Sequence, residues 1–159
     1  MAGTRTGRVC RYCGVDPDDV DFWDEHPDPT EADVRGLCEA WARYQARSPR
    51  TGRFHDEDPD SWAAIALHSF PHPPRMELEW SVIVTLCELV DPEDDWTVQM
   101  IGASPLEDFI DEHGDQALDL IEPAADQQPV LLAALRAVWP DEHVEPRIAR
   151  YLSARGEQR

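Results

Sequence analysis

One stretch of the sequence decides the fold: residues 91–139, which read DPEDDWTVQMIGASPLEDFIDEHGDQALDLIEPAADQQPVLLAALRAVW. Signals that begin a helix, signals that end one and apolar faces follow one another here with almost no residue to spare. Asp91-Pro92 and Gln128-Pro129 are typical of helix starts, because a proline in the first turn has no hydrogen bond to lose. The stretch therefore predicts a set of short, closely packed helices.

Two turns inside this stretch are predicted in detail. Gly102 is expected to end the first of these helices, because glycine is common just past a helix end. Ser104 and Glu107 then match a capping box, in which the two side chains accept N–H groups at the start of the next helix. Asp115 is expected to cap the helix that follows.

Helices are also predicted on either side of this stretch. Apolar residues at helical spacing indicate helices that begin near Thr30 and Asp58, another over residues 76–90, and a last one over residues 141–155. No stretch alternates between apolar and polar residues with a period of two, the pattern of a half-buried strand. We predict an all-α fold, a compact bundle or a short HEAT-like stack of about seven to eight helices.

The predicted helical domain spans residues 30–155, with an irregular segment at residues 1–29 and a frayed tail at residues 156–159. The helix over residues 76–90 is expected to be the central, most buried element. The main positions of its apolar stripe are Met76, Trp80, Ile83, Cys87 and Val90.

The charge of the chain limits its partners. The sequence has 14 bases, all of them Arg, against 33 acids, which gives a net charge of −19 at pH 7. Residues 76–135 contain fifteen Asp and Glu and no base. Such a surface repels nucleic-acid phosphates and anionic lipid headgroups and speeds association with basic proteins. We expect no nucleic-acid or membrane partner; the charge either recruits a basic protein or only keeps the chain soluble.

No apolar run near the N-terminus resembles a secretory signal, and no apolar stretch is long enough to cross a bilayer. The four cysteines, at positions 10, 13, 38 and 87, do not form the framework of a disulfide-stabilised protein. We therefore expect a cytoplasmic protein with reduced thiols.

Several motifs together resemble a known family. They are Asp91-Pro92 with Trp96, the turn GASPLED at residues 102–108, His113-Gly114, Ile121-Glu122 and Val138-Trp139. The pattern is similar to that of an uncharacterised bacterial family of small helical proteins, a domain of unknown function, over about residues 60–140. Ser104 stands where that family has a second glycine. The resemblance implies an all-helical fold and no assigned activity.

Cys10 and Cys13 form a Cys-x-x-Cys-Gly motif, a spacing at which two thiolates in a tight turn can hold one zinc ion. His26 follows at the distance found in classical zinc fingers, and Cys38 is the candidate fourth ligand. Cys38 also lies on the apolar stripe of the first long helix. The alternative to zinc is therefore a pair of ordinary thiols near the chain end.

A cluster of acids lies on the helix after the GASPLED turn and at the start of the next one: Glu107, Asp108, Asp111, Glu112 and Asp115. Residues four apart share a helix face, so these side chains can present an acidic surface. With His113 beside them they could also bind a metal or act as acid and base. Capping and the helix dipole already account for acids at a helix start, so we predict a partner-facing acidic surface and no catalytic residue.

Three functions fit these observations. The first is a non-enzymatic module that binds a basic protein through its acidic face, as immunity proteins and antitoxins do; this is an analogy of class. The second is a zinc-binding regulatory or scaffold module built on Cys10 and Cys13. The third is an enzyme with an unrecognised site. We favour the first, because the sequence shows no nucleophile motif and no Gly-rich phosphate loop.

Overall fold

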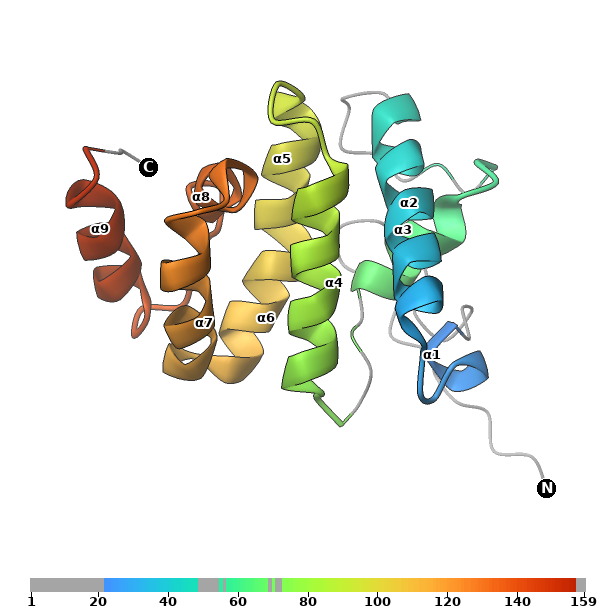
Figure 1. The fold of residues 1–159 in the computed structure, drawn as a ribbon, viewed down its shortest axis with the longest axis horizontal. Helices are drawn as coiled ribbons and strands as arrows, with labels where there is room; N and C mark the ends of the chain where they lie inside the picture. The colour runs from blue at the N-terminus through green and yellow to red at the C-terminus, as the bar shows by residue number, and fades with distance from the viewer. Residues whose placement is uncertain (1–21, 49–54, 56, 69, 71–72, 157–159) are drawn as a thin grey trace.

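The computed structural model describes residues 22–48, 55, 57–68, 70 and 73–156. The described part of the chain is helical and contains no strand, which confirms the predicted all-α fold. Its elements are α1 (Phe22–Glu25), α2 (Glu31–Arg47), α3 (Ser61–His68), α4 (Met76–Leu89), α5 (Asp95–Ile101), a π turn (Gly102–Leu106), α6 (Glu107–His113), α7 (Asp115–Ala125), α8 (Pro129–Leu135) and α9 (Glu145–Ser153). Figure 1 shows them side by side along the long axis, from α2 and α3 at one end to α9 at the other.

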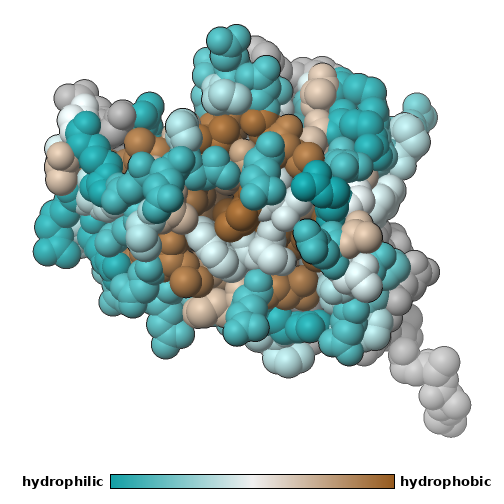
Figure 2. All heavy atoms as spheres, in the orientation of Figure 1, coloured by the Kyte–Doolittle hydropathy of each residue, from teal (hydrophilic) through white to brown (hydrophobic). Residues whose placement is uncertain are grey.

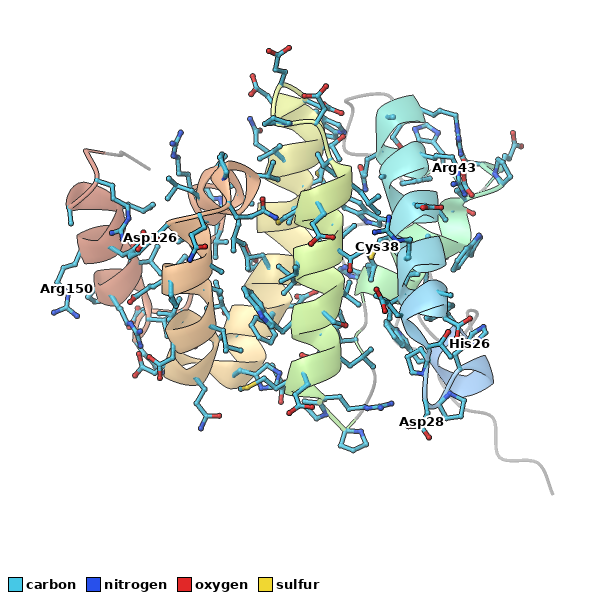
Figure 3. All side chains as sticks on the ribbon, in the orientation of Figure 1. His26, Asp28, Cys38, Arg43, Asp126 and Arg150 are labelled. Carbon is cyan, nitrogen blue, oxygen red and sulfur yellow. The ribbon has the colours of Figure 1, made fainter. Side chains whose placement is uncertain are left out.

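The start of α2 follows the sequence prediction. The Asp33 carboxylate accepts the backbone N–H of Thr30 at 2.8 Å, and the Thr30 hydroxyl accepts the N–H of Asp33 at 3.3 Å. This reciprocal pair is a capping box, which satisfies N–H groups that the helix itself leaves unpaired. Cys38, on the buried face of α2, points toward α4 (Figure 3).

The segment before α2 was predicted to be irregular, but its described part includes the short helix α1. Phe22 is buried, and its ring stacks on Trp62 of α3 with the centroids 5.7 Å apart. The indole N–H of Trp23 donates to the carbonyl oxygen of Ala66 at 2.9 Å. These contacts fix α1 on α3.

Helix α4 is the central element, as predicted, and it contacts α2, α5, α6 and α8. Three positions of the predicted stripe, Ile83, Cys87 and Val90, are buried. Val82, Ile83 and Leu86 are fully buried, whereas Met76 and Trp80 are only partly buried. Burial follows the positions of the four neighbouring helices, which the periodicity of a single helix does not reveal.

Gly102 does not end a helix, which corrects the sequence prediction. Helix α5 continues through the π turn into α6. A Cβ atom at Gly102 would lie 2.2 Å from the carbonyl oxygen of Ala134 and 2.8 Å from Cβ of Ala137. Glycine is therefore needed here because α8 passes directly over the backbone.

Pro105 lies inside the π turn and is buried. Because proline has no N–H to donate, it interrupts the α-helical hydrogen bonds, and a wider turn lets the chain continue helically past it. The start of α5 also differs from the prediction. Its cap is Asp94, not Asp91: the Asp94 carboxylate accepts the N–H of Thr97 at 3.3 Å and its hydroxyl at 2.6 Å.

Arginines hold α9 against α7. The Arg147 guanidinium reaches Glu122 and Asp119, each at 2.7 Å, and Asp115 at 3.1 Å. Arg155 forms an ion pair with Asp126. Arg150, by contrast, points away from the helices (Figure 3).

Hydrophilic side chains cover most of the face in Figure 2 and surround the places where hydrophobic ones show. No helix among the described residues combines the length and the apolar character needed to cross a bilayer.

Candidate functional site

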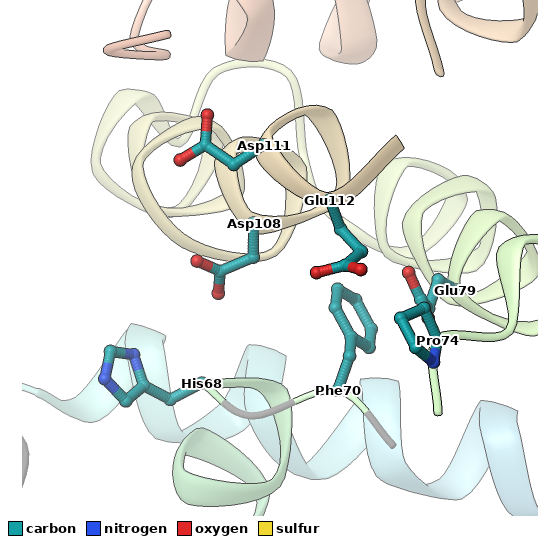
Figure 4. Close-up of a pocket in the computed structure, with 7 residues that line it drawn as sticks. All are labelled: His68, Phe70, Pro74, Glu79, Asp108, Asp111 and Glu112. Carbon is teal, nitrogen blue, oxygen red and sulfur yellow. The ribbon is translucent and has the colours of Figure 1, made fainter. Parts of the chain in front are cut away.

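A cleft of about 290 Å³ lies between α3, α4 and α6. We call it the acidic cleft; its lining residues are His68, Phe70, Pro74, Glu79, Asp108, Asp111 and Glu112. Figure 4 shows the Asp108 and Glu112 carboxylates pointing from α6 toward His68 of α3 and toward Phe70, whereas Asp111 points to the other side of α6. Glu79 lies on α4 at the other wall. None of these lining residues is Lys or Arg, so four carboxylates and one imidazole line the cleft.

Asp108 is the most perturbed group of the acidic cleft. Its Oδ2 atom is buried and has no hydrogen-bond partner among the described residues. Burial, followed by the charges of Glu107 and Asp111, raises the pKa of Asp108 to about 7. Burial also raises the pKa of Asp111, against a backbone hydrogen bond from Asp141 that lowers it.

Glu79 forms the inner wall of the acidic cleft and is 1% exposed. Its Oε2 atom lies 2.7 Å from Nε2 of His113, and its Oε1 atom accepts the backbone N–H of Arg75 at 2.6 Å. Buried carboxylates are rare unless they are paired in this way. The sequence analysis missed Glu79. One signal was available, because Glu79 lies three and four residues before Val82 and Ile83 and so shares their buried face.

The five acids predicted as one surface divide into two groups. Asp108, Asp111 and Glu112 line the acidic cleft. Glu107 accepts the backbone N–H of Trp139 at 2.8 Å, so it does not close the predicted capping box with Ser104. Asp115 is paired with Arg147. Glu107 and Asp115 do not belong to the cleft because their partners, Trp139 and Arg147, lie far along the chain.

The predicted zinc ligands lie partly outside the described residues, which do not include Cys10 and Cys13. His26 lies 3.9 Å from Asp33 and against the ring of Phe22. The Cys38 thiol is fully buried and donates to the carbonyl oxygen of Val82 at 3.6 Å, and burial raises its pKa to about 12. Cys38 thus belongs to the apolar stripe of α2.

Within the described ranges, no group of three or more His, Cys, Asp or Glu is arranged to hold a metal ion. The knuckle built on Cys10 and Cys13 stays a prediction.

Replacement of Asp108 by Asn is expected to stabilise the protein above pH 7 and to have little effect near pH 4. The native carboxyl keeps its proton to about pH 7, whereas the unfolded one loses it near 3.8, so wild-type stability falls as the pH rises between these values. Three pKa units set a ceiling of about 4 kcal/mol, and solvent in the open cleft lowers the expected gain to about 2 kcal/mol at pH 8. Urea unfolding at pH 4.5, 6 and 8 measures it.

The control for this series is Glu112→Gln, which removes an exposed carboxylate from the same helix. Its effect is expected to stay within about 0.5 kcal/mol at every pH. A gain from Asp108→Asn that does not vary with pH would contradict the buried, proton-holding carboxyl.

Comparison with known proteins identifies a family. The sequence model of a family of unknown function, DUF6869, matches residues 51–157. This range exceeds the resemblance over about residues 60–140 and includes all the residues that line the acidic cleft. No curated protein and no solved structure matches the chain. Because the family model covers more than half of the 159 residues, the chain belongs to the DUF6869 family.

Proposed function

We propose that the protein is a non-enzymatic module that binds a basic protein, and that the acidic cleft receives an Arg or Lys side chain of this partner. One observation carries the proposal: the buried Oδ2 of Asp108 accepts no hydrogen bond from a described residue, in a cleft lined by three further carboxylates. A guanidinium offers paired N–H donors with the geometry that carboxylates accept. Its charge would also offset the burial and repulsion that raise the pKa of Asp108.

The overall charge supports the same partner. A net charge of −19 produces a long-range field that accelerates encounter with a basic protein and orients it before contact. Among proteins of this kind, immunity proteins and antitoxins use an acidic face to cover a basic toxin. The comparison with immunity proteins and antitoxins rests on the general class and the size of these proteins.

Trp139 offers a second contact for such a partner. Its side chain is 81% exposed, and its backbone N–H is fixed by Glu107. Among the described residues it is the one large hydrophobic side chain that is mostly exposed. Tryptophan is enriched among the residues that dominate binding energy, and its face attracts Arg and Lys.

The test compares two triple variants, each of which replaces three carboxyl groups by amides, at pH 8, where Asp108 is mostly ionised. The cleft variant is Asp108→Asn, Asp111→Asn and Glu112→Gln; the control replaces the exposed Glu57, Glu77 and Glu88 by Gln. The partner is captured from host lysate on the wild-type protein, eluted with salt and purified. We expect the cleft variant to associate with it at least about tenfold more slowly at low salt, and the control less than about threefold more slowly.

Two results would contradict the proposal. Equal slowing in both variants would show that total charge, and not the cleft, attracts the partner. Capture of no basic protein from the lysate would remove the partner class itself. A wild-type affinity that rises between pH 6 and pH 8 would support the role of Asp108, because a cation binds the ionised carboxylate and Asp108 ionises over this range.

A further inference from the structure

A second cavity, of about 340 Å³, lies between the C-terminal end of α2 and the start of α5. Its polar lining residues are Gln45, Ser48, Asp91, Glu93, Asp94 and Trp96. It shares no residue with the acidic cleft, so a ligand bound there would be independent of the proposed function. Its volume lies near the lower end of the range for small-molecule sites, about 300–1,000 Å³, and suits a molecule of monosaccharide size.

Two polar side chains at this cavity have unmet hydrogen-bonding capacity. The Trp96 indole nitrogen and the Ser48 hydroxyl are buried without a partner among the described residues. Gln45 also lines the cavity and is 6% exposed.

Such groups rarely gather by chance, because a buried polar group without a hydrogen bond costs stability. Trp96 can only donate, so whatever binds beside it must carry an acceptor such as a hydroxyl oxygen. The Ser48 hydroxyl and the Gln45 amide can both donate and accept, and they favour a ligand with several hydroxyl groups. The lining is therefore matched to a polyhydroxylated molecule.

Carboxylates add a preference for positive charge. Asp91 and Glu93 are exposed residues of the cavity lining, and the Asp91 carboxylate accepts the N–H of Glu93 at 2.9 Å. The Asp94 carboxylate caps α5 through Thr97 and so belongs to the helix itself. No Lys or Arg is among the described residues that line this cavity. An ammonium group near Asp91 and Glu93 would thus meet negative charge without a competing base.

We propose that this cavity is a binding site for a small hydroxylated amine of the amino-sugar class. A ligand hydroxyl accepts the Trp96 indole N–H, further hydroxyls bond to Ser48 and Gln45, and the ammonium group lies against Asp91 and Glu93. The ligand chemistry follows from the donor-only indole on one side and the carboxylates on the other.

The test is a titration of the full chain with three probes, followed through the indole N–H resonances in ¹H–¹⁵N spectra. The probes are glucosamine, glucose, which lacks the charge, and 1,4-diaminobutane, which lacks the hydroxyls. Glucosamine is expected to shift the Trp96 resonance saturably, with an affinity at least about tenfold higher than that of either other probe, because each of those probes loses one class of contact.

Variants locate the site by calorimetry with glucosamine. Trp96→Phe and Gln45→Leu are each expected to weaken binding about tenfold, while the matched control Trp139→Phe binds as the wild type. The pair Asp91→Asn and Glu93→Gln should lower the affinity for glucosamine to that for glucose. Thermal unfolding confirms that each variant is folded.

Three outcomes would overturn the proposal. One is the absence of a saturable shift with glucosamine, the result for a cavity that holds only water. Another is equal binding of all three probes. The third is wild-type affinity in folded Trp96→Phe and Gln45→Leu variants.

Discussion

Replacement of Gly102 by Ala is expected to lower the free energy of unfolding by about 4 kcal/mol. The added Cβ would lie 2.2 Å from the carbonyl oxygen of Ala134, a backbone atom that cannot rotate away. Helix α8 would have to move, and with it the contacts of α8 with α4 and α5. For a chain of this size the melting temperature should fall by about 8–16 °C.

Gly36→Ala is the matched control. Gly36 lies in the exposed middle of α2, and a Cβ there would meet nothing within 4 Å. Alanine favours the helix over glycine, so this variant should gain about 0.5–1 kcal/mol. Thermal and urea unfolding of both variants measures the pair. A Gly102→Ala protein that melts within 2 °C, roughly, of the wild type would show that α8 does not pass as closely as the structure places it.

Replacement of Glu79 by Ala should cost about 3 kcal/mol, the second largest effect. The substitution leaves Nε2 of His113 without its described partner and removes the acceptor of the Arg75 N–H at the start of α4. Buried groups that lose a partner incur the full cost of desolvation, which exceeds the net value of the bond itself. Unfolding in urea at pH 7 measures the loss.

Two further variants separate these causes. Glu79→Gln keeps an oxygen for the Arg75 N–H and places an amide beside His113, so it should lose only about 1 kcal/mol. Glu77→Ala removes an exposed acid from the same turn and should change stability by less than about 0.5 kcal/mol. Equal losses in the Gln and Ala variants would mean that the charge of Glu79, and not its hydrogen bonds, stabilises α4.

Helix positions with local causes could be predicted from the sequence. The Thr30 cap, the Pro129 start of α8 and the apolar stripe of α9 each depend on residues within one or two turns. The predictions were wrong where contact with a second helix determines the local structure. A glycine that ends a helix and a glycine over which another helix passes have the same local sequence, so Gly102 was misassigned. In DPEDD, more than one Asp can cap a helix, and the prediction chose Asp91 where Asp94 does.

The candidate site was predictable only in part. The carboxylates on α6 are evident from spacing, but the opposite wall comes from residues of α3 and α4 that lie at least 29 residues earlier in the chain. No local pattern indicates that Glu107 meets the backbone of Trp139 or that Asp115 meets Arg147. The second cavity was not predicted either, because the missing hydrogen-bond partners of Ser48 and Trp96 are evident only once the neighbouring residues are placed.

The π turn also determines where the chain can change length. Its i→i+5 hydrogen bonding closes a turn with one residue more than an α turn, so the segment Gly102–Leu106 takes up one residue without rotating α6 relative to α5. In a regular helix, the loss or gain of one residue rotates everything beyond it by about 100°. Such a change elsewhere in α5 or α6 would turn Phe109 out of the core and Asp108 away from the acidic cleft. Between Trp96 and Asp108, this turn is therefore the place where the deletion of one residue leaves both ends in phase.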